Sequence, residues 1–131
     1  MIQKNELKKI AKARIKDADI LLSSGRYDGA IYLCGYAIEL ALKTRICTTL
    51  KWSGYPNTNR EFKDYNSFRT HDLDVLLHLS GKELFIKTNY LAEWSVVVGW
   101  SPLSRYQLIG TTRRPDVISM VDATKNLVRK I

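Results

Sequence analysis

The chain has 131 residues, the size of one domain, and we expect a single helical domain over residues 1–131. No apolar run approaches the roughly 18 residues that a membrane-spanning helix needs. The lysine-rich start lacks the apolar centre of a signal peptide. The sequence therefore excludes a membrane protein and predicts a cytoplasmic location.

Positive charge is concentrated in two places. The formal net charge is +8, and residues 1–16 carry six basic side chains against Glu6 alone. A second group, Arg105, Arg113 and Arg114, lies before the expected last helix. Basic faces attract phosphate backbones and acidic surfaces. Charge alone leaves three interpretations open: a nucleic-acid site, a site for an acidic protein, or a solvated helix face.

The first expected helix runs from about Asn5 to Ser23. Its apolar residues recur at helical spacing, whereas lysines four residues apart form an outer stripe; Ser23, Ser24 and Gly25 should end it. A second helix is expected over about Tyr27 to Leu50, with Asp28 as its N-terminal cap.

The second helix is unusually rich in small residues. Gly35 costs about 1 kcal/mol relative to alanine inside a helix, so we expect another backbone to approach closely there. The partner is either a second copy of the chain, in a symmetric dimer, or the first helix of the same chain. The residues concerned are Ala30, Cys34, Gly35, Ala37 and Ala41.

The two cysteines, Cys34 and Cys47, lie on this same expected helix. Thirteen helical residues separate them by about 20 Å, which is too far for a disulfide. We therefore expect two reduced, buried thiols, in keeping with a cytoplasmic protein.

Three further helices complete the expected fold. Thr70 is a candidate cap for a short third helix that ends at Ser80 and Gly81, and Pro115 suits the first turn of the last helix. The pattern predicts an all-α, up-down antiparallel bundle of about five helices. Its remaining parts are a loop over residues 51–67, a helix within residues 89–98 and a loop over residues 99–115.

Three segments resemble the HEPN family of small helical domains. Residues 17–43, DADILLSSGRYDGAIYLCGYAIELALK, are similar to the first helical hairpin of that family. Thr70-His71-Asp72-Leu73, followed by Leu76-Leu77, and Trp100-Ser101-Pro102, followed by Arg105-Tyr106, fit it in the same order. The resemblance implies a HEPN-like bundle. It does not decide the activity, because the family contains both ribonucleases and members without known chemistry.

Ribonucleases of that family carry an arginine followed, after four to six residues, by a histidine. Here the gaps are one residue from Arg69 to His71, eight from Arg69 to His78, and ten from Arg60 to His71. The motif is absent, so the sequence favours a module without nuclease activity. The alternative is a divergent metal-independent ribonuclease that uses His71 with Arg69 or Arg105.

Several residues are candidates for a binding site. Glu39 is a carboxylate in an apolar helix and needs a partner, either Lys43 one turn on or Arg105 from the later loop. His71 is expected in the first turn of its helix, where it acts as a base or bonds the loop. An arginine can bind phosphate and a tyrosine can stack on a base. The candidate phosphate ligands are Arg105, Tyr106, Arg113, Arg114, Glu39 and His71.

No zinc signature, phosphate loop or bound cofactor is expected from the sequence. The leading hypothesis is a homodimeric interaction module that binds nucleotide or RNA phosphate. The resemblance adds a possible partner, a minimal nucleotidyltransferase, in a prokaryotic toxin–antitoxin or defence context. A third hypothesis is a structural partner whose basic first helix docks on an acidic protein.

Overall fold

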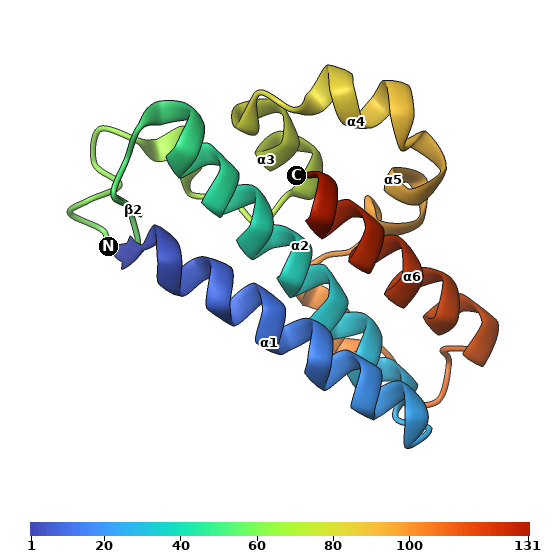
Figure 1. Cartoon of the computed structure of the whole chain (residues 1–131). Coiled ribbons are helices and arrows are strands. Elements are labelled where there is room, and N and C mark those ends of the chain that lie inside the picture. The colour runs from blue at the N-terminus through green and yellow to red at the C-terminus, as the bar shows by residue number, and fades with distance from the viewer.

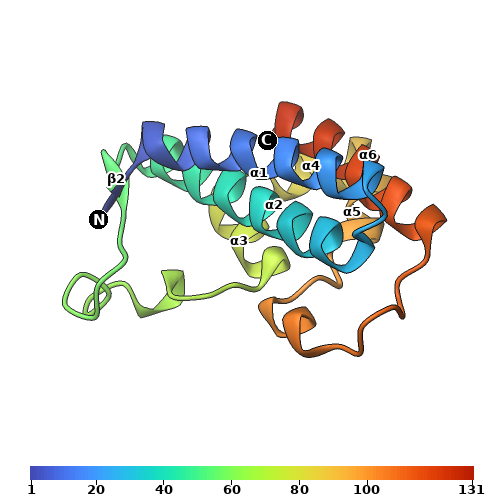
Figure 2. The ribbon, with the colours of Figure 1, turned by 90° about the horizontal axis from the view of Figure 1, so that it is seen from below.

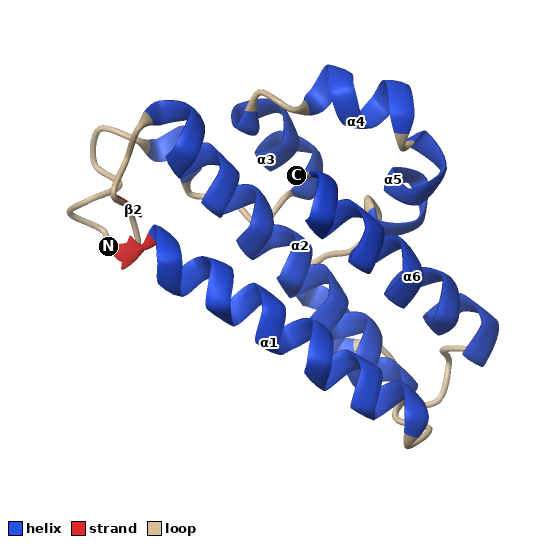
Figure 3. Ribbon diagram, in the orientation of Figure 1, coloured by secondary structure: helices blue, strands red, loops and turns tan.

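The computed structural model describes residues 1–131 and is almost entirely helical (Figures 1 and 3). This confirms the predicted all-α class. None of the helices is both long and apolar enough to cross a bilayer. The α-helices are α1 (Lys4–Ser23), α2 (Tyr27–Leu50), α3 (Leu73–Ser80), α4 (Glu83–Asn89), α5 (Leu91–Val97) and α6 (Arg114–Lys130). Two 3-10 turns, η1 (Asn66–Phe68) and η2 (Pro102–Tyr106), and two short strands, β1 (Ile2–Gln3) and β2 (Gly54–Tyr55), complete the chain.

The hairpin of α1 and α2 forms where the sequence predicts it. Gly25 adopts a positive φ of 73° in the turn, a conformation that favours glycine. The expected cap of α2 was wrong, however. Arg26 is the residue at the N-cap, and the Asp28 carboxylate instead accepts a hydrogen bond of 3.0 Å from the backbone N–H of Gly110. Asp28 therefore fixes the later loop to the start of α2.

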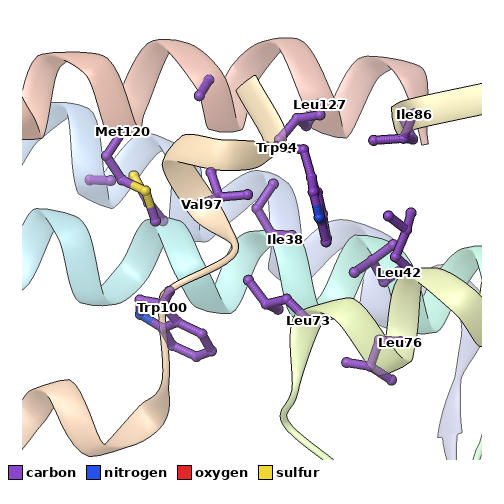
Figure 4. Close-up of a cluster of buried hydrophobic side chains, with 14 of the residues drawn as sticks. Ile38, Leu42, Leu73, Leu76, Ile86, Trp94, Val97, Trp100, Met120 and Leu127 are labelled. Carbon is purple, nitrogen blue, oxygen red and sulfur yellow. The ribbon is translucent and has the colours of Figure 1, made fainter. Parts of the chain in front are cut away.

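Helix α2 is the centre of the bundle. It packs against α1, α3 and α6 (Figure 1), which is why its sequence is apolar on several sides. Ile38 and Leu42 are fully buried on it, and Trp94 of α5 lies between them and Leu127 of α6 (Figure 4). The same core takes in Leu73 from α3.

The short helices differ from the expectation in number and in one cap. The structure has six α-helices rather than about five, because α4 was not predicted. Only Ile86 of α4 is buried, whereas Leu84 and Phe85 are exposed, so this helix has no apolar periodicity. Thr70 does not cap α3: the carboxylate of Asp72 accepts the N–H groups of Asp74 and Val75.

The loop after α2 is held by aromatic side chains. β1 and β2 pair antiparallel, with Ile2 opposite Tyr55, and so tie the start of the loop to the start of the chain. Tyr55 is buried and its hydroxyl donates a hydrogen bond of 2.6 Å to the carbonyl of Phe68. Trp52, Phe62 and Tyr65 pack around this pair. The loop is therefore an ordered cover on the bundle.

Candidate functional site

One side of α2 carries polar side chains in a row. Tyr32, Tyr36, Glu39 and Lys43 follow at intervals of four, three and four residues, which places them on one helix face. Two loop segments, residues 56–72 and 99–113, lie on the same side of α2, away from α1 and α6 (Figure 2). We call the surface between these two segments the α2 polar face. The candidate site is built on it.

Glu39 is the buried centre of this face. The residue is 2 % exposed, and its Oε1 lies 2.7 Å from Nδ1 of His71. Its Oε2 accepts a second hydrogen bond of 3.3 Å from Nζ of Lys43. A carboxylate offers only acceptors, so Nδ1 of His71 must carry the proton of that bond. Nε2 is then free to accept a proton or a hydrogen bond.

Of the two expected partners of Glu39, Lys43 is confirmed; Arg105 makes no ion pair with the carboxylate, whose other partner is His71. The expected position of His71 was wrong: it does not lie in the first turn of α3, because the helix begins at Leu73 and Asp72 is its cap. The His71 side chain is 60 % exposed. It is thus a loop residue that a buried carboxylate holds in place.

Arg105 and Tyr106 lie at the other end of the α2 polar face. The guanidinium carbon of Arg105 lies 4.8 Å from the ring centroid of Tyr106, within the range of a cation–π contact. The pKa of the Tyr32 hydroxyl is lowered, chiefly by a hydrogen bond with Tyr36 and to a smaller extent by one with Arg105, because both bonds stabilise the phenolate. Tyr106 is 73 % exposed. These two side chains are therefore open to a ligand.

Trp100 joins the two ends of the face. Its ring packs edge-on against Tyr36, with centroids 5.1 Å apart, and tilted against Tyr32. A Cβ on Gly35 would overlap the Trp100 ring, so only glycine admits the indole at this position. The expectation of a close backbone at Gly35 was wrong: the close neighbour is the Trp100 side chain.

The other small residues of α2 are packed inside the chain. Ala30, Cys34 and Ala37 are at most 1 % exposed, and Ala41 is 9 % exposed. They lie on the helix that α1 and α6 cover. The small residues were expected to face either a second copy of the chain or its own first helix. In the structure they are packed within one chain.

Two cavities meet at His71. One, of about 350 Å³, is lined by His71, Asp72, Trp100, Ser101 and Pro102. The other, of about 230 Å³, lies under the aromatic loop and includes Lys43, Phe68, Arg69 and His71. The exposed imidazole thus borders hollow surface on both sides. A ligand in either cavity would meet it.

The remaining predicted residues are arginines. Arg69 lines the cavity under the aromatic loop together with His71; it is exposed and its guanidinium carbon lies 5.6 Å from the ring centroid of Phe62. Arg113 and Arg114 are exposed at the start of α6, and neither forms an ion pair or a side-chain hydrogen bond. The chain has no group of three or more His, Cys, Asp or Glu side chains that could hold a metal ion. The site therefore rests on Glu39, His71 and Arg105.

The contact of His71 with Glu39 was missed from the sequence, and so was that of Trp100 with Gly35. Gly35 was the available signal for the second, since a mid-helix glycine indicates a close neighbour. No local signal indicated the first, because 32 residues separate its partners.

Comparison with known families identifies the hairpin. Residues 5–58 match the family model described as HEPN domain. No curated protein and no solved structure matches the chain. The matched stretch contains all of α1 but its first residue, together with α2 and β2, and the helical architecture agrees with it. The similarity to the HEPN domain family thus covers residues 5–58, which include Glu39 and the α2 side chains of the α2 polar face.

Proposed function

We propose that the chain is a binding module that holds the phosphate of an RNA or a nucleotide on the α2 polar face. Arg105 is the observation that carries the proposal. Its guanidinium is exposed, has no carboxylate partner and lies beside Tyr32 and Tyr106. A guanidinium can bind phosphate bidentately, while an exposed tyrosine ring can stack on a base.

His71 adds a second polar group on the same face. Its Nε2 is directed away from the bond with Glu39 and can contact a phosphate or a ribose hydroxyl. Arg113 and Arg114, at the start of α6 directly after the loop that carries Arg105, add positive charge for a longer ligand. Such charges steer polyanions and make binding dependent on salt.

Assembly forms part of the same proposal. The resemblance to the HEPN family supports a homodimer, and it supports a minimal nucleotidyltransferase as a partner protein in a prokaryotic toxin–antitoxin or defence pair. The loop of the site exposes Leu103, Leu108 and Ile109, which are 69 %, 80 % and 96 % exposed. Three exposed apolar side chains within one short stretch of loop support an interface there. Light scattering at micromolar concentration tests the dimer; the mass of a single 15.1 kDa chain would contradict it.

Fluorescence anisotropy with a labelled single-stranded RNA, and competition by mononucleotides, tests phosphate binding. We expect Arg105→Gln to weaken binding about tenfold or more, the cost of a charged hydrogen bond. Arg60→Gln is the matched control, because it removes the same charge from an exposed loop outside the site. Equal losses in the two variants would refute a specific role for Arg105.

The geometry of His71 favours a second candidate, metal-independent RNA cleavage. A buried carboxylate that fixes the Nδ1 proton of an exposed imidazole is an arrangement suited to general base catalysis. Nε2 would take the proton of the ribose 2′ hydroxyl, whose oxygen attacks the adjacent phosphorus. The bond to the 5′ oxygen then breaks and that oxygen receives a proton, which leaves a cyclic phosphate. Arg105 or Arg69 would neutralise the phosphate.

Incubation of labelled RNA with the protein in EDTA separates this candidate from binding alone. Cleavage that is lost in His71→Ala and retained in His78→Ala would establish it, since His78 is exposed on α3 and does not contact Glu39. Intact RNA at high protein concentration would rule it out and leave the binding proposal standing.

A further inference from the structure

A groove on another side of the bundle gathers positive charge without any acidic side chain. It has a volume of about 390 Å³ and is formed by side chains of α1, α2 and α6. Lys8 and Lys12 come from α1, Arg45 from α2 and Arg129 from α6. None of these residues belongs to the α2 polar face, so a ligand bound in the groove leaves the proposed phosphate site free.

The four cations form no ion pair within the chain, although neighbouring Lys9 and Arg14 do. Nε of Arg45 is buried and has no hydrogen-bond partner. The four cations are therefore available to acceptors from outside the chain.

Between the cations the groove offers apolar surface from Ala11, Ala41 and Val128. Thr44 and Thr48 also line it, and their hydroxyls donate to carbonyls of α2 itself. The small side chains of Ala11 and Ala41 leave the space open between the three helices. A fitting ligand thus carries negative charge at its edges and an apolar group between them.

Two lysines of α1, Lys8 and Lys12, line the groove four residues apart. The same spacing continues along α1 with Lys4 and Lys16, and none of the four is ion-paired. Four residues of helix rise about 6 Å. A second helix with carboxylates four residues apart has the same repeat, so its charges can pair with the stripe along its length. It also supplies apolar side chains for the apolar surface of the groove, which a phosphodiester strand does not.

We infer that this groove is a docking site for an acidic amphipathic helix of a partner protein. Glutamate or aspartate side chains of that helix pair with Lys8, Lys12 and Arg45, and an apolar side chain between them packs on the apolar surface of the groove. Exposed ion pairs alone contribute little, so the half-buried Arg45 and the apolar contact provide the specificity.

A labelled synthetic helical peptide tests the inference. The peptide has glutamate at every fourth position and leucines on the same face; a second peptide replaces the leucines by serine. We expect the first to bind in fluorescence anisotropy and the second to bind at least about tenfold more weakly. Equal affinities, or no binding by the first peptide, would overturn the proposal.

Charge-matched variants locate the site. The triple variant Lys8→Gln, Lys12→Gln, Arg45→Gln should lose at least about tenfold in affinity for the leucine peptide. The triple variant Lys51→Gln, Arg60→Gln, Lys63→Gln removes the same charge from the aromatic loop and should retain affinity within about twofold. Equal losses would show non-specific attraction and overturn the proposal.

A single-stranded RNA is the competing ligand. If it binds more tightly than the leucine peptide and only the groove triple loses that binding, the groove is a nucleic-acid site and the proposal is wrong. Methyl NMR signals of Ala41 and Val128 report on the groove directly, and circular dichroism confirms that each variant is folded. Arg105→Gln should leave peptide binding unchanged, which separates this test from that of the proposed function.

Discussion

Oε1 of Glu39 lies 2.7 Å from Nδ1 of His71, and this bond joins the centre of α2 to the loop before α3 across 32 residues of sequence. The carboxylate side chain is 3 % exposed whereas the imidazole is 60 % exposed. The core thus holds Glu39 in place, and Glu39 in turn holds His71. Any chemistry at His71 depends on Glu39 as a positioning residue.

Replacement of Glu39 by glutamine should destabilise the fold and loosen His71. The amide oxygen can still accept the Nδ1 proton, but the half-buried Lys43 loses its only ion pair. We expect a loss of about 1–3 kcal/mol in the free energy of unfolding, measured by urea denaturation. Glu93→Gln, which removes a carboxylate without an ion pair, is the control and should change stability by less than about 0.5 kcal/mol.

Nitrogen-15 NMR of the imidazole gives a second readout for the same pair. In the wild-type protein His71 should hold its proton on Nδ1, and Glu39→Ala should shift the ring towards the mixture of tautomers that free histidine shows. The same spectrum for both proteins would mean that the carboxylate does not position the ring.

The pair of Gly35 and Trp100 predicts an unusual response to alanine. Alanine normally stabilises a helix by about 1 kcal/mol relative to glycine. At Gly35, however, the new Cβ would overlap the indole of Trp100, so we expect Gly35→Ala to lose about 1–3 kcal/mol through overpacking. Tryptophan fluorescence should shift to the red as Trp100 leaves its site.

Gly29→Ala is the matched control on the same helix. Its Cβ would lie 3.2 Å from Cδ1 of Leu21, a flexible side chain that can move. This variant should be as stable as the wild type or more so. If Gly35→Ala were equally well tolerated, the indole of Trp100 would not be seated against α2.

Local sequence signals account for the long helices and fail where distant segments meet. The bounds of α2 could be predicted because Ser23, Ser24 and Gly25 interrupt one apolar period and Tyr27 begins another. α4 was missed because one buried residue, Ile86, gives no period. Hydrophobic periodicity indicates which face of a helix is buried. It does not indicate which other segment of the chain packs against that face.

The candidate site shows the same division. Glu39 could be singled out from sequence because a carboxylate in an apolar helix needs a partner. Which partner it takes depends on the path of the loop from Trp52 to Asp72, which is set by aromatic packing around Tyr55. That packing is a property of the tertiary structure. Only the structure could therefore show that the loop residue bonded to Glu39 is His71 and not Arg105.

Both cysteines should be unreactive in the folded protein. Burial raises the pKa of the Cys34 thiol to about 11 and also raises that of Cys47. Because the thiolate is the reactive species, a disulfide reagent at pH 8 should modify neither thiol in the native state and both in urea. Fast modification without denaturant would show that α2 opens locally.

Alkaline stability should depend on two tyrosines, the buried Tyr55 and the half-buried Tyr36. The hydrogen bond with Tyr32, followed by burial, raises the pKa of Tyr36 to about 12, and burial raises that of Tyr55 further. An unperturbed tyrosine has a pKa of 10.0. Below pH 10 both hydroxyls stay protonated in the folded and in the unfolded protein, so their contribution to stability is complete. Above pH 10 they ionise first in the unfolded protein, so stability falls as the pH rises towards their pKa in the folded protein.

Urea denaturation at pH 8 and near pH 11 measures this dependence. Tyr55→Phe should flatten it, while costing about 1 kcal/mol at pH 8 for the lost hydrogen bond to Phe68. Tyr65→Phe changes a ring that is 45 % exposed and should leave the dependence intact. Absorbance at 295 nm should show Tyr36 and Tyr55 ionising after the other tyrosines. If all seven ionised together near pH 10, the aromatic loop would not cover Tyr55, and the cavity that joins Lys43, Arg69 and His71 would lose its floor.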